Sequence, residues 1–256
     1  CAGKGGQDGS EHCGEIDCPV CVTYGFSIGK FNRSFHGLAQ FYDAQLLFFP
    51  IASFIGPVWI TWPDALRQAG YTLAADLIPD AQDKVSVVPE LVKQEKGQTW
   101  RYINLGLINL EIANNHLDAD DLFTKLKLPD KFTPIKNRLV LVPDKLAPVL
   151  VNNNLEVRTS VAIDPASGAA LDKALYTYEA IPRSSVLSIN INYLNPQHFM
   201  FPSQEGLATF DENKSCEWVE KQVLKGAKLM KYLGIGGMNT RGFGRFEVLE
   251  KRGDAQ

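Results

Sequence analysis

The sequence predicts a two-layer α+β fold from three observations. Short segments rich in apolar and β-branched residues alternate with clusters of Gly, Pro, Asn and Asp, the pattern of strands separated by turns. The segment Glu217 to Leu233 repeats apolar residues at helical spacing, which indicates an amphipathic helix. Strands, a hairpin and helices are mixed along the chain, as expected where helices pack on a sheet. Because 45% of the 256 residues are hydrophobic, the chain can bury a substantial core as one domain, with or without insertions.

Strands are expected first between Ala44 and Ile60, where Pro and Gly indicate a tight bend between two buried strands. A turn cluster, Asp164 to Gly168, separates two extended segments and predicts a β-hairpin of Glu156 to Ile163 with Leu175 to Ala180. Further strands are expected at these ranges: Val85 to Val88, Trp100 to Leu110, Arg138 to Val142, Val186 to Leu194 and Gly244 to Leu249.

The long helix near the end has the clearest periodicity. Its apolar side chains recur at helical spacing: Val219, Val223, Ala227 and Met230. Gly234 follows the helix, at the position where a left-handed residue is favoured. Shorter helices are expected at Asp64 to Ala75, at Asp118 to Leu126, and at Pro143 to Val151 before the turn Asn152 to Asn154.

Charge and hydropathy exclude some classes of protein. The net charge is −3 and 21% of residues are charged, so no overall positive field attracts nucleic acid, and any such contact has to be local. The longest apolar run, around Leu46 to Ile60, is interrupted by Pro and Gly, which argues against a membrane span. The first ten residues lack the features of a secretory signal, so a cytoplasmic protein is expected. Because the chain begins with Cys in a loop-like stretch, we expect residues upstream of it.

Residues 1–40 are rich in Gly and Cys and predict a small metal-stapled segment. Cys13, Cys18 and Cys21 have the spacing with which thiolates hold a tetrahedral zinc ion. The fourth ligand is open between Cys1 and His12; Cys1 is favoured because His12 is adjacent to Cys13. The alternatives are reduced structural thiols or, less favoured in a cytoplasmic chain, a disulfide. Cys216 is expected to be an ordinary thiol.

A glycine-rich loop follows the long helix. Five glycines lie between Leu233 and Arg245, where they let the backbone approach a ligand and expose amides, while Arg241 and Arg245 can neutralise phosphates. The order helix then loop excludes a P-loop or a dinucleotide fingerprint, which run strand, loop, helix. The alternative is a simple turn between the helix and an edge strand.

A glycine-rich loop near the C-terminus is typical of the RAMP superfamily, and the chain resembles its Cmr-type backbone subunit of type III CRISPR effector complexes. The resemblance spans roughly Cys13 to Leu249. It rests on these further stretches: Asp43 to Ser53; Leu139 to Asp144; and Val157 to Asp164 followed by Gly168, Ala174 to Tyr176 and Glu179 to Pro182. Cys18, Cys21, Tyr24 and Gly25 are also similar to zinc-bearing relatives in Csm-type complexes.

The resemblance implies a ferredoxin-like, RRM-related RAMP fold with an inserted thumb hairpin at about 155–183. It implies a division into a zinc-stapled segment, 1–40, and a RAMP core, 41–256, with an insertion at about 80–135 and the first strand and helix upstream. Such subunits stack with copies of themselves in a helical filament on crRNA, beside other CRISPR effector subunits, and take part in target RNA recognition. The implied RNA-binding residues are Ser53, Arg158, Lys173, Tyr176, Arg183, Gly236, Gly237, Asn239, Thr240, Arg241 and Gly242. For Arg158 the alternative is a surface ion pair with Glu156 or Asp164.

In the family, target RNA is cleaved with a divalent metal such as Mg²⁺ and an aspartate in the loop between the first strand and the first helix. That loop is expected upstream of Cys1, so no catalytic residue is assigned here, and Asp17 is expected to orient the zinc turn. Two other functions remain: a CRISPR precursor-RNA processing endoribonuclease, and a non-catalytic zinc-containing structural protein.

Overall fold

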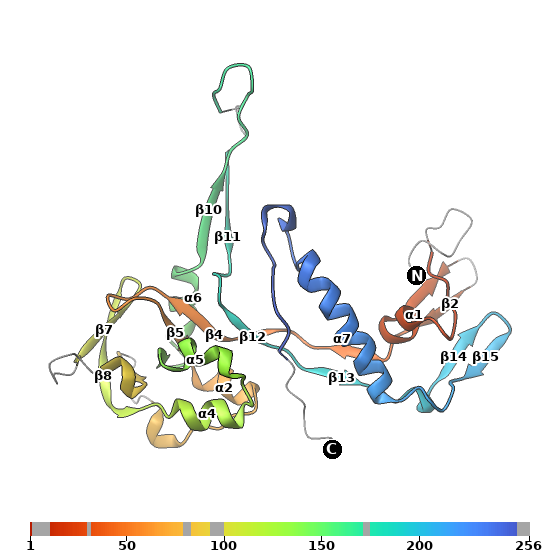
Figure 1. Ribbon diagram of the computed structural model, residues 1–256, viewed down its shortest axis with the longest axis horizontal. Coiled ribbons are helices and arrows are strands. Elements are labelled where there is room, and N and C mark those ends of the chain that lie inside the picture. Colours follow the sequence, from red (N-terminus) through yellow and green to blue (C-terminus); the bar gives the residue numbers. More distant parts are fainter. Residues whose placement is uncertain (2–10, 30–31, 79–82, 93–99, 171–174, 250–256) are drawn as a thin grey trace. The chain divides into compact units, whose positions relative to one another are not determined.

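The structure, a computed structural model, describes residues 1, 11–29, 32–78, 83–92, 100–170 and 175–249 (Figure 1). These residues form two compact units. The first unit draws on Cys1–Asp43 and Ile189–Glu250, and the second is built around Ala44–Ser188. The N-terminal cysteine segment therefore folds together with the end of the chain. No helix of the described residues has the length and apolar character needed to cross a membrane.

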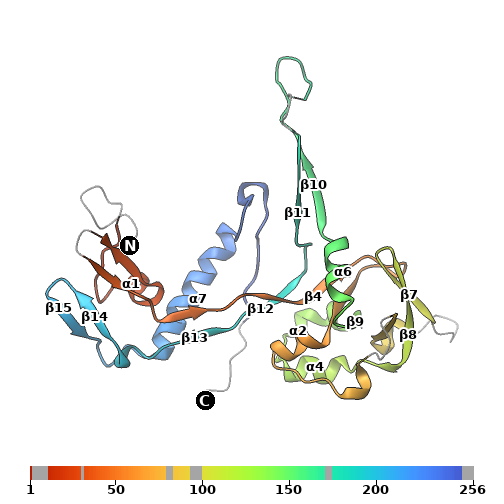
Figure 2. The same ribbon diagram turned by 180° about the vertical axis from the view of Figure 1, so that it is seen from behind.

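A seven-stranded mixed sheet is the centre of the second unit (Figure 2). Its spatial order is β12-β4-β5-β9-β6-β8-β7, in which β5 with β9 and β6 with β8 run parallel and the other neighbours antiparallel. Its strands are β4 (Gln45–Ile51), β5 (Val58–Thr61), β6 (Lys84–Val87), β7 (Tyr102–Leu105), β8 (Ile108–His116), β9 (Leu139–Leu141) and β12 (Val186–Ser188).

Short helices cover this sheet, and most of them carry apolar residues that reach the core. Leu66, Leu122 and Leu150, from three of them, are fully buried against the strands, and the ring of Phe48 stacks on that of Phe123 at 5.9 Å. The helices are α2 (Pro63–Gln68), η2 (Ala75–Leu77), α3 (Pro89–Val92), α4 (Ala119–Lys125), η3 (Asp130–Phe132), α5 (Thr133–Lys136) and α6 (Ala147–Asn153).

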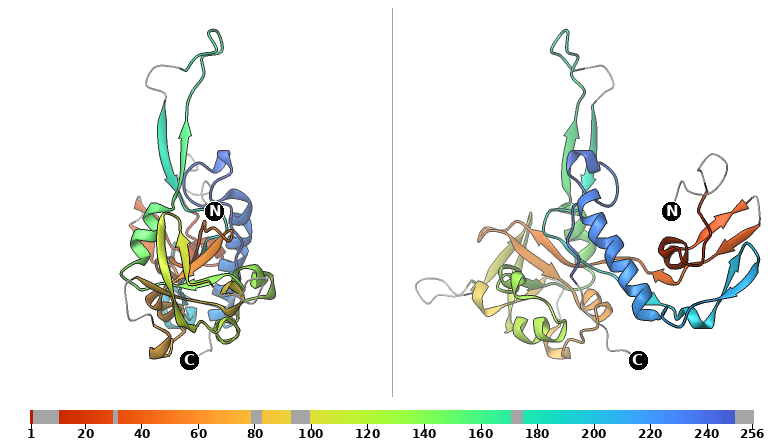
Figure 3. Two further views of the ribbon diagram at one scale, coloured as in Figure 1. Left: turned by 90° about the vertical axis from the view of Figure 1, so that its left-hand side faces the viewer. Right: turned by 45° about the vertical axis from the view of Figure 1, so that its right-hand side comes forward.

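The predicted hairpin is present in this unit as β10 (Glu156–Ser160) and β11 (Tyr176–Ala180), here called the thumb hairpin. It extends away from the sheet (Figure 3). Its antiparallel register pairs Arg158 with Tyr178 and Ser160 with Tyr176. Because neighbouring residues of a strand point to opposite faces, Arg158, Tyr176 and Tyr178 share one face.

The first unit packs three two-stranded sheets and one long helix around a small aromatic core. Phe26, Phe35 and Phe201 are at its centre, and the ring centroid of Phe201 lies 5.5 Å from that of Phe26 and 5.2 Å from that of Phe35. Its elements are α1 (Pro19–Tyr24), β1 (Phe26–Ile28), β2 (Arg33–Phe35), β3 (Ala39–Phe41), β13 (Ile191–Tyr193), η4 (Pro196–His198), β14 (Met200–Ser203), β15 (Gly206–Thr209), α7 (Cys216–Leu233) and η5 (Asn239–Arg241).

The mixed α+β class is confirmed, and several boundaries differ from those predicted. The strand predicted at Val186 to Leu194 is two strands, because β12 pairs with β4 and β13 pairs with β3 in the other unit. The strand predicted at Trp100 to Leu110 bends at Gly106, which has a φ of +62°, and so becomes part of a hairpin. The strand predicted at Gly244 to Leu249 is wrong, because this segment joins no sheet of the described chain.

Candidate functional site

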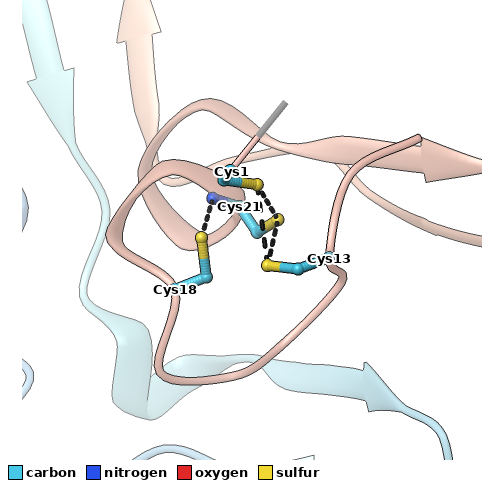
Figure 4. Close-up of side chains that lie close together, drawn as sticks. All are labelled: Cys1, Cys13, Cys18 and Cys21. Atoms are coloured by element: carbon cyan, nitrogen blue, oxygen red, sulfur yellow. Dashed lines mark hydrogen bonds between the residues drawn. The ribbon is translucent and has the colours of Figure 1, made fainter. Parts of the chain in front are cut away.

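The four predicted cysteine ligands converge in the first unit (Figure 4). The Sγ of Cys1 lies 3.2 Å from that of Cys21 and 3.6 Å from that of Cys13, and all four sulfurs lie within 4.8 Å of one another. Cys18 precedes α1 and its sulfur accepts a hydrogen bond from the Cys21 amide. In the part of the chain that the structure describes, the side chains of these four cysteines are close enough to one another to bind one metal ion together.

The spacing of this cysteine cluster (Cys1, Cys13, Cys18 and Cys21) fits zinc. A tetrahedral site with Zn–S bonds of about 2.3 Å places its sulfurs about 3.8 Å apart. The Cys13 and Cys21 sulfurs are 3.8 Å apart and those of Cys1 and Cys13 are 3.6 Å apart, whereas the Cys1–Cys21 distance of 3.2 Å is shorter. His12 Nδ1 lies 3.4 Å from the Cys1 sulfur, so His12 borders the cluster next to the favoured fourth ligand.

The environment of the cluster affects its thiols unequally. Burial raises the pKa of the Cys21 thiol to about 12, and neighbouring thiols reinforce the shift. Burial also acts to raise the pKa of Cys18, but hydrogen bonds from the Cys21 amide and the Cys13 thiol outweigh it and leave that pKa below its usual value. Cysteine binds metal as the thiolate, so a bound cation would favour the deprotonated form of Cys21 that burial disfavours.

Lys214 anchors the turn that carries Cys18. Its ammonium group donates to the Ile16 carbonyl at 2.7 Å and to the Asp17 carboxylate at 2.8 Å. The residue is only 8% exposed, and its ammonium lies over the rings of Phe210 and Trp218. The expected role of Asp17 in orienting the turn thus acquires a partner that the sequence did not reveal.

The glycine loop (residues 234–245) is closed by its own backbone. The Ile235 amide donates to the Gly244 carbonyl at 3.0 Å, and the Gly242 amide to the Asn239 carbonyl at 3.0 Å. Gly244 has a φ of +70°, and a Cβ there would lie 1.9 Å from the Ile235 carbonyl oxygen, so this position requires glycine for folding. Asn239 is half-buried beside Gly234.

Other glycines of the same loop lie in open space, although Gly236 and Gly242 have the positive φ that favours glycine. At Gly236, Gly237 and Gly242 a Cβ would meet no heavy atom within 4 Å. Gly237 also has an ordinary backbone conformation, so both sterics and φ would permit a side chain. Arg241 and Thr240 are exposed next to this open backbone. The loop therefore offers an accessible main chain beside a guanidinium group, a surface suited to phosphate.

On the thumb hairpin, Arg158 forms the surface ion pair with Glu156 that is the expected alternative to RNA binding. Its Nε donates to the Glu156 carboxylate at 2.6 Å. The pair is exposed, and exposed pairs contribute little stability, so a phosphate can compete for the guanidinium. The Tyr176 and Tyr178 ring centroids are 6.0 Å apart on the same face. Lys173, the other predicted hairpin residue, lies outside the described residues.

Ser53 and Arg183, which are 130 positions apart in the sequence, both line a hollow of about 480 Å³ at the root of the thumb hairpin. In the β4–β5 turn beside this root hollow, the backbone amides already donate hydrogen bonds within the protein. The Ser53 amide donates to the Gly56 carbonyl and the Gly56 amide to the Ser53 carbonyl, while the Phe54 amide donates to Asn104 Oδ1. A ligand there would therefore meet side chains rather than these amides. The exposed Arg183 side chain has no hydrogen-bond or ion-pair partner in the described part of the chain.

Sequence reasoning missed Arg138, which shapes this turn. Its Nε donates to the Pro57 carbonyl and its Nη2 to the Ile55 carbonyl, each at 2.5 Å. A positive charge thus lies directly against the β4–β5 turn. No local pattern could have revealed it, because Arg138 is more than 80 positions away in the sequence.

Comparison with protein families identifies the chain. The model of the RAMP superfamily matches residues 11–247. The chain belongs to the RAMP superfamily. No curated protein matches this RAMP chain.

Solved structures show the same fold at low sequence identity. A crystal structure of Cmr4 superposes with a TM-score of 0.53 at 21% identity, over 81% of this RAMP chain and 71% of the other. A crystal structure of oligomeric Cmr4 from Pyrococcus furiosus gives a TM-score of 0.51 at 20% identity, with 81% and 71% covered. A cryo-EM structure of Type III-B Cmr-beta in the apo state gives 0.50 at 14% identity, with 88% and 73% covered.

Proposed function

We propose that this chain is a crRNA-binding backbone subunit of a type III CRISPR effector complex. The observation that carries the proposal is the RAMP family match over residues 11–247. The structural neighbours are Cmr4, including an oligomeric form, and a Type III-B Cmr assembly. The finer form of the fold, a ferredoxin-like core with a thumb insertion, belongs to the same proposal.

The glycine loop supports RNA backbone recognition. Gly236, Gly237 and Gly242 leave an open strip of main chain, and Arg241 lies in the same turn. A chain with a net charge of −3 cannot attract RNA through its overall field, so it needs such local sites. Reading the ribose-phosphate chain suffices for a backbone subunit, because base pairing between guide and target carries the sequence information.

The thumb hairpin and the root hollow supply a second surface. Tyr176 and Tyr178 offer rings to bases, while Arg158, Arg183 and Ser53 offer polar contacts to phosphates. In this proposal, copies of the chain stack along the guide RNA in a helical filament with other effector subunits, and the hairpin takes part in target RNA recognition.

Zinc in the cysteine cluster is the structural part of the proposal. Bound there, zinc would be held by Cys1, Cys13, Cys18 and Cys21 and would staple the N-terminal segment to the core of the first unit. We assign RNA binding and assembly to this chain and assign no residue to cleavage.

RNA affinity of a glycine-loop variant tests the proposal. Fluorescence anisotropy with a labelled single-stranded RNA carrying a guide-type 5′ handle should show tight, salt-sensitive binding by the wild-type chain. Gly237→Ala should weaken it, because the added methyl group covers the open backbone. Gly29→Ala is the matched control, since Gly29 also has open space and an ordinary backbone conformation. Wild-type protein that fails to bind RNA would refute the proposed function.

A further inference from the structure

An exposed aromatic surface lies beside the root hollow in the second unit. Phe54, at the tip of the β4–β5 turn, is 51% exposed, and Trp100, just before edge strand β7, is 37% exposed. Their ring centroids are 4.7 Å apart in an edge-to-face arrangement. Tyr102 of β7 is also exposed, and the Arg101 guanidinium lies 5.5 Å from its ring centroid.

The surrounding backbone fixes Phe54 in this exposed position. Its amide donates to Asn104 Oδ1 at 2.7 Å, and the Gly106 amide donates to the Ala52 carbonyl at 2.9 Å, so the β7–β8 hairpin holds both sides of the turn. Arg138 holds the other end of the same turn through two carbonyls. Phe54 is thus presented by a rigid turn rather than by a loose loop.

The location favours a nucleotide as the ligand of these rings. Phe54 lies between Ser53 and Gly56, both of which line the root hollow, and so does Arg183, whose side chain has no partner among the described residues. Apolar rings therefore adjoin a hollow lined by a cation and by the Ser53 hydroxyl, which donates to the Gly56 carbonyl. This combination matches the two parts of a nucleotide, a base with a flat face and a phosphate with negative charge. A protein partner would have no comparable need for an arginine-lined hollow next to the rings.

We propose that Phe54 and Trp100 form a stacking platform for one nucleobase of a single-stranded RNA whose backbone runs through the root hollow past Ser53 and Arg183. The inference rests on the proposed RNA-binding function and adds to it a base-contacting subsite outside the thumb hairpin and the glycine loop. Because a ring face stacks on every base, the platform binds RNA without sequence preference.

Substitution of the rings, with two probes, tests the platform. The first probe is a single-stranded RNA containing 2-aminopurine, whose fluorescence is quenched by stacking, and the second is inorganic polyphosphate, which has charges but no bases. Phe54→Ala and Trp100→Ala should each weaken RNA binding roughly 5- to 150-fold and reduce the quenching, with polyphosphate binding unchanged. Phe54→Leu keeps apolar bulk at the turn, and it should show the same loss with an unchanged melting temperature. Tyr232→Ala, which removes an exposed ring of the first unit, is the control.

The outcomes separate this inference from the proposed function. Wild-type protein that does not bind the RNA would refute both. Wild-type binding that Phe54→Ala, Phe54→Leu and Trp100→Ala all leave unchanged would overturn the platform alone. If these variants keep their RNA affinity but, without RNA, associate with one another less than the wild-type chain does, the surface binds protein. That result would also overturn the platform.

Discussion

The ammonium group of Lys214 and the carboxylate of Asp17 lie 2.8 Å apart, although 197 positions separate them in the sequence. The same ammonium donates to the Ile16 carbonyl, so one buried side chain fixes the turn that leads into Cys18. A zinc site with four thiolates carries a net negative charge, and the nearby ammonium would offset part of it. Groups outside the ligand set commonly orient metal ligands in this way.

Replacing Lys214 should therefore lower both stability and zinc affinity. Lys214→Met keeps much of the apolar stem but leaves the Ile16 carbonyl without its donor, which we expect to cost about 1–3 kcal/mol of unfolding free energy. Chelator competition should show weaker zinc binding, and Lys214→Arg should recover part of it. Lys225→Met, on the exposed side of α7, is the control and should change neither quantity. Equal zinc affinity in the Met variant would contradict this role.

Zinc content should depend on the thiols of the cysteine cluster. The wild-type protein should contain about one zinc ion per chain, and the variant with both Cys18→Ser and Cys21→Ser should contain almost none, because two thiolates cannot hold a structural site. Cys216→Ser, outside the cluster, should retain the metal. Metal analysis of purified protein measures this, and equal zinc content in the double variant would remove the metal site.

Alanine substitutions at two positions of the glycine loop should have different effects, one on stability and the other on RNA binding. Gly244→Ala should destabilise the first unit by about 2 kcal/mol or more, because its Cβ collides with the Ile235 carbonyl and its φ is positive. Gly237→Ala should change stability by less than about 0.5 kcal/mol and still weaken RNA binding. Thermal melts and anisotropy together separate the two effects. A Gly237→Ala variant that unfolds like Gly244→Ala would contradict the assignment.

The stability of the second unit should fall in strongly alkaline solution. Burial and the hydrogen bond to Asp121 raise the pKa of Tyr71 to about 12, above its usual value near 10. Because the folded pKa is the higher one, this stabilisation is complete below about pH 10 and is lost as pH rises toward 12, by on the order of 2 kcal/mol. Tyr71→Phe should flatten this part of the profile in denaturant titrations at several pH values. An unchanged profile in that variant would contradict the cause.

Local patterns predicted the elements whose cause is local. Helix α7 and the thumb hairpin followed from periodicity and turn residues, and the cysteine spacing indicated the cluster because three of its members are close in sequence. The split into β12 and β13 could not be predicted, because it depends on which distant strand each segment pairs with. Arg138, Lys214 and the pair of Phe54 with Trp100 act on partners more than 40 positions away, and a single sequence carries no signal for such contacts.

Gel filtration of the wild-type chain with single-stranded RNAs of two lengths tests the central claim most directly. A backbone subunit should elute as a small species without RNA and as assemblies whose mass increases in proportion to RNA length when guide-type RNA is present. Elution at one unchanged position, with no RNA in the protein peak at either length, would contradict the account and favour a zinc-containing structural protein.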